Sequence, residues 1–192
     1  SLTVDGCAGN DSITGNGGAD VLLGGDGNDQ VNGGRGNDTA LLGAGDDSFT
    51  WNPGDGSDVV EGQAGTDTLQ FNGANIPEKI GLSANGGRLR FTRDGANIVM
   101  DVNDTEHVNF VALGGADTIN VGDHAATDVT QVNLDLSNPP GTGTGDAAAD
   151  TVIVTGTSGN DSIDILGSGT SFSVAGLPTL VSVTGSEGAS DA

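Results

Sequence analysis

The sequence has few of the residues from which most catalytic and nucleic-acid-binding sites are built. Its 192 residues include no tyrosine, one cysteine, two histidines and five lysines or arginines. A single cysteine excludes an intramolecular disulfide and a metal site made of several cysteines. Five basic residues against 27 acidic ones exclude nucleic acid as an expected partner, because phosphate binding needs clustered lysines and arginines.

Aromatic side chains and long apolar runs are also scarce. Aromatic residues make up 3% of the chain and 35 residues are glycine, so the composition favours a thin aliphatic core. No apolar run approaches the length of a transmembrane helix, so we expect no membrane insertion. A net charge of −22 opposes compaction unless cations neutralise it, which leaves a disordered acidic polymer or a protein folded by metal.

What the chain has instead is a nine-residue repeat. From residue 6 it reads GCAGNDSIT, GNGGADVLL, GGDGNDQVN, GGRGNDTAL and LGAGDDSFT. A two-residue insertion, Trp51 and Asn52, follows, and the period resumes at Pro53 in PGDGSDVVE and GQAGTDTLQ. The sixth place is always aspartate: Asp11, Asp20, Asp29, Asp38, Asp47, Asp58 and Asp67.

Each block divides into a six-residue turn and a three-residue extended piece. The glycines permit turn conformations that other residues disfavour. The piece after each aspartate is polar, apolar, polar, which predicts a short strand with one inward side chain. These are Ile13, Leu22, Val31, Ala40, Phe49, Val60 and Leu69. Two blocks then make one turn of a flattened coil, and stacked turns form two parallel sheets in a right-handed β-solenoid.

This geometry predicts metal sites between successive turns of the coil. Aspartates two blocks apart lie one turn apart, at about 4.8 Å, and two oxygens on opposite sides of one calcium ion are also about 4.8 Å apart. We expect calcium, roughly five ions, between the pairs 11/29, 20/38, 29/47, 38/58 and 47/67. Carbonyl oxygens of the turns complete a hard-oxygen shell that suits Ca²⁺ better than Mg²⁺ or Zn²⁺. The turn residues assigned to these sites are Gly9, Gly18, Gly25, Gly27, Gly34, Gly36, Gly45, Asn28 and Asn37.

The repeat follows the pattern G-G-x-G-x-D-x-U-x, in which U is a large apolar residue. Residues 6–70 therefore resemble the hemolysin-type calcium-binding (RTX) repeats of secreted bacterial proteins. The resemblance implies a calcium-loaded parallel β-roll and export by type I secretion. It also implies folding outside the cell, so the expected location is extracellular or on the cell surface.

The second half of the chain keeps the same local pattern without the period. We divide the chain into a β-roll at 1–71 and an irregular β-rich region at 72–192, which makes the whole chain all-β. DTLQF at 67–71 is echoed at 117–121, 150–154 and 161–165, and residues 79–113 predict longer antiparallel strands. Asp161 has the best local match to a metal turn, whereas Asp117 and Asp150 suit a plain turn equally well. Stacking on the roll and separate folding both stay open.

Two further groups of residues have an ordinary and a functional interpretation. Lys79, Arg88, Arg90 and Arg93 lie within fifteen residues and suit either an acidic polysaccharide or charge balance against nearby acids, and we favour charge balance. Cys7 is interpreted as a small turn residue and Trp51 as a cap on the thin core.

We expect no enzymatic activity, because His107 and His124 are the only histidines and no nucleophile elbow or zinc-binding motif accompanies them. They are expected on the surface or between strands. Carboxylate pairs could serve a glycosidase, but we expect calcium to occupy them.

The leading hypothesis is a monomeric calcium-binding structural module. The alternatives are an adhesin or matrix segment with a glycan or protein partner, and the non-catalytic repeat region of a secreted enzyme. The chain does not start with methionine, and the repeat pattern predicts a fragment of a longer protein.

Overall fold

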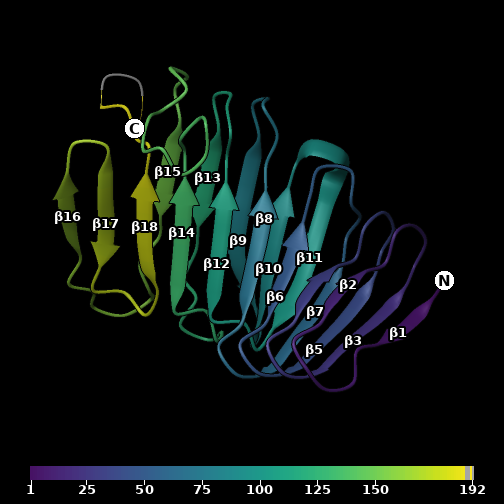
Figure 1. Cartoon of the computed structure of the whole chain (residues 1–192). Coiled ribbons are helices and arrows are strands. Elements are labelled where there is room, and N and C mark those ends of the chain that lie inside the picture. Colours follow the sequence, from purple (N-terminus) through teal and green to yellow (C-terminus); the bar gives the residue numbers. More distant parts are fainter. Residues whose placement is uncertain (189–190, 192) are drawn as a thin grey trace.

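The computed structural model describes residues 1–188 and 191, and its strands form two nine-stranded sheets (Figure 1). Sheet A contains, in spatial order, β1 (Thr3–Asp5), β3 (Val21–Asp26), β5 (Thr39–Ala44), β7 (Val59–Ala64), β11 (Ile98–Asn103), β10 (Arg88–Arg93), β9 (Lys79–Asn85), β13 (Thr118–Val121) and β15 (Thr151–Val154). Sheet B contains, in the opposite direction along the stack, β16 (Asp164–Ser168), β17 (Ser171–Ala175), β18 (Leu180–Thr184), β14 (Gln131–Asp135), β12 (His107–Val111), β8 (Thr68–Asn72), β6 (Ser48–Trp51), β4 (Gln30–Asn32) and β2 (Ser12–Thr14). One short 3₁₀ turn, η1 (Gly95–Asn97), completes the regular structure of the described part.

The repeats form the predicted flattened coil. Strands one turn apart pair in parallel with an eighteen-residue offset, for example Leu22 with Ala40 and Ile13 with Val31. All seven predicted inward side chains are buried. The sheet A strands are longer than predicted: β3 and β5 stay paired through Gly25–Gly43 and end at Asp26–Ala44, because glycine lets the extended chain continue into the turn.

The core is widest around a stack of aromatic rings in the middle of the molecule. Trp51 is fully buried and lies parallel to Phe71 with ring centroids 4.1 Å apart, and Phe71 stacks on Phe91 at 4.2 Å. The indole N–H donates to the carbonyl of Gly56 at 2.8 Å, so the insertion loop closes over the ring. Trp51 therefore belongs to the core, as expected, but lies in its middle and not at its end.

Both sheets run across residue 71 without a break (Figure 1). Strand β12 pairs in parallel with β8 on one side and β14 on the other, and β13 pairs in parallel with β9. The second half therefore stacks on the roll, which settles a question that the sequence leaves open. The physical reason is burial, because β12 presents Val108 and Phe110 to the same core as Leu69.

The predicted antiparallel segment is correct in part. Strands β9, β10 and β11 pair antiparallel as expected. Residues 107–111 do not continue this arrangement; they cross to sheet B and pair in parallel. The predicted strands at 117–121 and 150–154 are present as β13 and β15, whereas that at 161–165 starts only at Asp164, on an exposed edge strand. Within residues 1–188 and 191, no helix is long and apolar enough to span a membrane.

Candidate metal sites

The aspartates of the repeats stack into two columns, one along each side of the coil. Column B contains Asp11, Asp29, Asp47 and Asp67 and precedes the strands of sheet B; column A contains Asp20, Asp38 and Asp58 and precedes those of sheet A. In each column the backbone N–H of one aspartate donates to Oδ1 of the next. The distances are 2.8, 2.7 and 2.9 Å along column B and 2.7 and 2.9 Å along column A. The five expected pairs are therefore neighbours in the structure.

The second carboxylate oxygen of every column member has no partner. Oδ2 is buried and without a hydrogen bond in Asp11, Asp20, Asp29, Asp38, Asp47, Asp58 and Asp67. Six of these side chains are at most 3% exposed, Asp11 being the more open one. A buried anion without a partner is expensive, and two columns of them repel one another as well. Cations beside the Oδ2 atoms would therefore stabilise this arrangement.

A small space lies beside five of these oxygens because glycine stands five residues before Asp11, Asp20, Asp29, Asp38 and Asp67. A methyl group added at Gly24 would lie 2.5 Å from Oδ2 of Asp29 and would overlap the carbonyl oxygen of Leu42. One added at Gly6 would lie 2.8 Å from Oδ2 of Asp11 and 2.5 Å from the carbonyl oxygen of Gly24. The space is therefore lined by carboxylate and carbonyl oxygens, the donors that calcium prefers.

The assigned turn glycines all adopt backbone conformations that other residues avoid. The seven φ values are positive: Gly9 128°, Gly18 110°, Gly25 113°, Gly27 124°, Gly34 77°, Gly36 133° and Gly45 137°. Except at Gly9 and Gly18, their main chains also pass close to the preceding turn, so that a side chain at Gly36 would overlap the carbonyl of Gly18. Glycine here brings carbonyl oxygens of successive turns close together.

The two assigned asparagines have a different contact. Oδ1 of Asn28 accepts the N–H of Asp46 at 3.1 Å, and Oδ1 of Asn37 accepts that of Ser57 at 3.1 Å. Both side chains are exposed, and they link successive turns along the surface of the coil. Asp161 lies apart from both columns, and its exposed carboxylate accepts hydrogen bonds from the N–H and the hydroxyl of Thr157.

Side chains alone do not complete a metal site here. Within the part of the chain that the structure describes, no group of three or more His, Cys, Asp or Glu side chains is placed to hold one ion. Each gap between turns offers two stacked carboxylates and the carbonyl oxygens of the turns. A hard ion that accepts many neutral oxygens fits such a donor set, and a thiol- or imidazole-seeking ion does not.

Burial alters the acidity of the column carboxyls in the metal-free chain. Desolvation raises the pKa of Asp58 to about 7, against the lowering effect of the Asp38 N–H and with the help of the Asp38 and Asp55 charges. Desolvation likewise raises the pKa of Asp67 to about 6. A metal ion would displace these protons, because it binds the ionised carboxylate.

Three acidic residues occupy equivalent positions in the stack but do not follow the spacing of the nonapeptide repeat. Oε2 of Glu106 accepts the N–H of Asp67 at 2.8 Å and so extends column B. Glu78 and Asp117 stand in the same position before β9 and β13, and the N–H of Glu78 donates to Oδ1 of Asp117 at 2.7 Å. The spacing of eighteen or twenty misses these residues because the intervening loops are longer. An acid five residues after glycine and directly before an alternating strand is the signal that marks Glu78.

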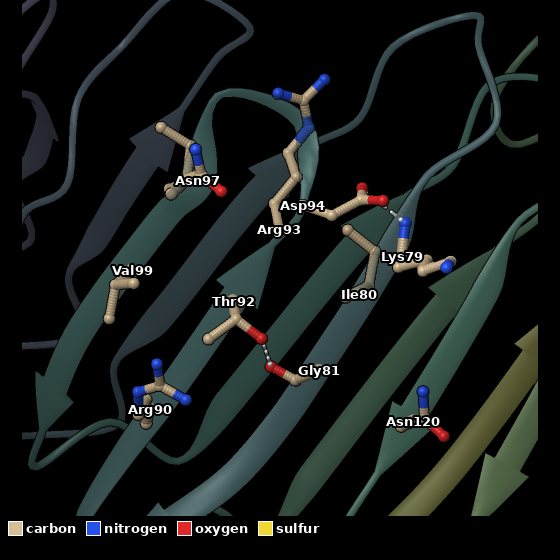
Figure 2. A pocket seen from close by; sticks show the side chains of 11 residues that line it. Lys79, Ile80, Gly81, Arg90, Thr92, Arg93, Asp94, Asn97, Val99 and Asn120 are labelled. Atoms are coloured by element: carbon tan, nitrogen blue, oxygen red, sulfur yellow. Dashed lines mark hydrogen bonds between the residues drawn. The ribbon is translucent and has the colours of Figure 1, made fainter.

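Two of the four clustered basic residues pair with acids, so the charge-balance interpretation holds for half of the cluster. Arg88 pairs with Glu61 at 2.8 Å and with Asp101 at 2.6 Å, and Arg93 pairs with the buried Glu78. Lys79 and Arg90 instead line a shallow groove of about 390 Å³ on the outer face of sheet A. Figure 2 shows them on either side of the hydrogen bond between Thr92 and Gly81.

The first half of the chain matches a known repeat family. Residues 5–40, 23–50 and 54–75 match the model of the RTX calcium-binding nonapeptide repeat, in four copies. The match confirms the resemblance found in the sequence and supports a calcium-binding repeat module over these residues, which lie between positions 5 and 75 of the chain. No curated protein matches the chain.

Proposed function

We propose that the chain is a structural module of a secreted protein that folds when calcium fills the five gaps between its stacked aspartates. The observation that carries this proposal is the set of buried Oδ2 atoms without hydrogen-bond partners among the described residues; those of Asp11, Asp20, Asp29 and Asp67 lie beside a main-chain carbonyl oxygen of another turn. Bound calcium supplies positive charge and accepts oxygen ligands from both sides of each gap.

Different groups of the protein have different roles at such a site. The N–H groups of the aspartates fix Oδ1, so that Oδ2 is the oxygen left to face an ion. Glycines five residues before five of the seven aspartates leave room for the ion, and the positive-φ glycines bring the turns close together. Five ions contribute about +10 against the net charge of −22, and they act where repulsion is densest.

The histidines support a role without catalysis. Among the described residues, neither ring nitrogen of His124 has a hydrogen-bond partner, and the side chain is 2% exposed. Burial lowers the pKa of His124, so the ring stays neutral at physiological pH. A buried neutral imidazole without a contact to a hydroxyl or thiol group cannot activate a nucleophile.

Removal of calcium tests the proposal directly. We expect the chain to lose most of its β-sheet circular dichroism in EDTA and to regain it cooperatively on adding calcium. Magnesium at the same concentration is the control and should restore little, because it keeps its own water shell. A β-sheet spectrum that is the same in EDTA and in calcium would contradict the proposal.

The groove at Lys79 and Arg90 favours a second candidate function, binding of an acidic polysaccharide. It is a concave surface lined by Lys79, Arg90 and the ion-paired Arg93, together with Asp94, on a strongly acidic protein. Lys79→Gln combined with Arg90→Gln should weaken retention on immobilised polygalacturonate at low salt. Arg35→Gln is a control that changes the one basic residue outside the cluster. Equal retention of all three proteins would eliminate this candidate.

A further inference from the structure

Three acidic residues outside the RTX repeats reproduce the backbone contacts of column A. Glu78, Asp117 and Asp150, here called the C-terminal column, directly precede β9, β13 and β15. The N–H of Asp117 donates to Oδ1 of Asp150 at 2.8 Å, just as the N–H of Glu78 donates to Asp117. The carbonyls of Glu78 and Asp117 accept the N–H groups of Thr118 and Thr151 at 2.9 and 2.8 Å. The column is therefore stacked like those of the repeats, although its members are 39 and 33 residues apart.

Asp117 has the same unpartnered oxygen as the repeat aspartates. It is 1% exposed, and its Oδ2 atom is buried without a hydrogen bond. No other aspartate beyond residue 71 in the described part has such an atom. This oxygen is the feature that distinguishes Asp117 from an ordinary turn residue.

The surroundings of Asp117 are acidic on several sides. Glu78 and Asp150 are its neighbours in the column, and Oδ2 of Asp146 accepts the N–H of Gly115, two residues before Asp117, at 2.6 Å. None of the ion pairs between described residues includes Asp117, Asp146 or Asp150. Among the described residues, Arg93 therefore balances Glu78, but no protein cation pairs with Asp117, Asp146 or Asp150.

An oxygen-lined space also recurs here. A methyl group added at Gly73, five residues before Glu78, would lie 2.6 Å from Oε2 of Glu78. It would also lie 2.8 Å and 3.0 Å from the carbonyl oxygens of Val111 and Ala112. The space again lies between a carboxylate oxygen and carbonyls of the next turn, as at Gly24, but Oε2 of Glu78 also accepts the N–H of Ala74 at 2.9 Å.

An arginine separates the C-terminal column from column A. The N–H of Asp58 meets Sδ of Met100 at 3.5 Å, so column A ends there. Arg93, 7% exposed, pairs with Oε1 of Glu78 and donates to the carbonyl of Gly95 at 3.0 Å. A guanidinium thus provides the positive charge on this side of Glu78, whereas the Asp117 side has none.

The geometry points to an additional calcium-type site at Asp117, held between Glu78 and Asp150 and lying outside the matched repeats. Its ligands are Oδ2 of Asp117, the facing carboxylates and carbonyl oxygens of residues 111–112. The inference rests on the proposed function, because it extends the same ligand chemistry to a part of the chain without the nonapeptide pattern. The metal would fasten β13 and β15 onto the stack.

The test is a count of calcium ions bound by the full chain, by native mass spectrometry and isothermal titration. Asp117→Asn keeps an acceptor for the Glu78 N–H but replaces Oδ2 by an NH₂ group. We expect it to bind one or two fewer ions than the parent. Asp161→Asn is the matched control: it removes the same charge from an exposed turn aspartate whose two oxygens already accept hydrogen bonds from Thr157. It should bind as many ions as the parent.

A second measurement on the unaltered chain covers the case in which Asp117→Asn folds poorly. Calcium should slow amide hydrogen exchange in residues 112–118 and 150–154 together with that of the repeats. An Asp117→Asn count equal to the parent's, or exchange in these segments that calcium leaves unchanged while the repeats respond, would overturn this inference alone. A parent chain that binds no calcium at all would overturn the proposed function as well.

Discussion

Replacement of Asp29 by asparagine should change the stability of the chain in opposite directions with and without calcium. Asp29 lies in the middle of column B and borders two gaps, towards Asp11 and towards Asp47. Asparagine keeps the acceptor for the Asp11 N–H and removes the unpartnered Oδ2. In calcium the variant should therefore lose about two sites, whereas Asp11→Asn, at the start of the column, should lose one.

The size of the effect follows from mass action. At free calcium tenfold above the dissociation constant, each occupied site stabilises the folded state by about 1.4 kcal/mol. Asp29→Asn should thus cost about 2.8 kcal/mol and Asp11→Asn about 1.4 kcal/mol. For a chain of this length, these values correspond to decreases in melting temperature of roughly 6 to 11 °C and 3 to 6 °C.

In EDTA the sign should reverse. The 1% exposed carboxylate of Asp29 is then a buried anion without a counter-charge, and its neutral replacement removes that cost. Calcium stoichiometry by titration and melting curves by circular dichroism in calcium measure the first effect, and the β-sheet circular dichroism that remains in EDTA measures the second. Asp46→Asn is the control, because Asp46 is exposed and its Oδ1 only accepts the N–H of Thr66. Equal ion losses for the Asp29 and Asp11 variants, or destabilisation of the Asp29 variant in EDTA, would refute the pairing across gaps.

Three other predictions follow from acidity, packing and the space beside the aspartates. The folded pKa of Asp58, about 7, lies above its unfolded value. The calcium-free chain should therefore lose stability as the pH rises from about 4 to 7, by up to about 1.4 kcal/mol per unit for each such carboxyl, and a β-sheet circular dichroism signal in EDTA that grows over this range would contradict it. Gly24→Ala should weaken calcium binding at least tenfold, because the added methyl group fills the space beside the carboxylate. Gly17→Ala, whose methyl group would meet only a carbonyl oxygen at 3.7 Å, should bind calcium as the parent does. Trp51→Ala should cost about 3 to 5 kcal/mol by opening a cavity against Phe71, measured by urea unfolding in calcium, and a cost below 1 kcal/mol would exclude the ring stack as a core element.

The sequence alone determines the roll and the two repeat columns. A period of nine sets the length of every turn, so residues eighteen apart must meet on the same side of the coil. This period determines where the inward side chains, the positive-φ glycines and the stacked aspartates lie. Even the insertion of Trp51 and Asn52 changes little, because Asp38 still meets Asp58, now twenty residues away.

Only the tertiary structure decided the C-terminal column and the path of the chain between Phe71 and Thr118. In the C-terminal column, Glu78 and Asp117 are 39 residues apart, and Asp117 and Asp150 are 33 residues apart. Because the loops between them differ in length, the sequence has no fixed period that would predict the strand register. That register is set by burial of apolar side chains such as Ile80 and Ile119 on neighbouring strands. The same requirement sends residues 107–111 to the opposite sheet, because Val108 and Phe110 are buried there against β8. Where the turns have constant length, the sequence period determines which strands and aspartates meet. Where the turns differ in length, packing of apolar side chains in the core determines it.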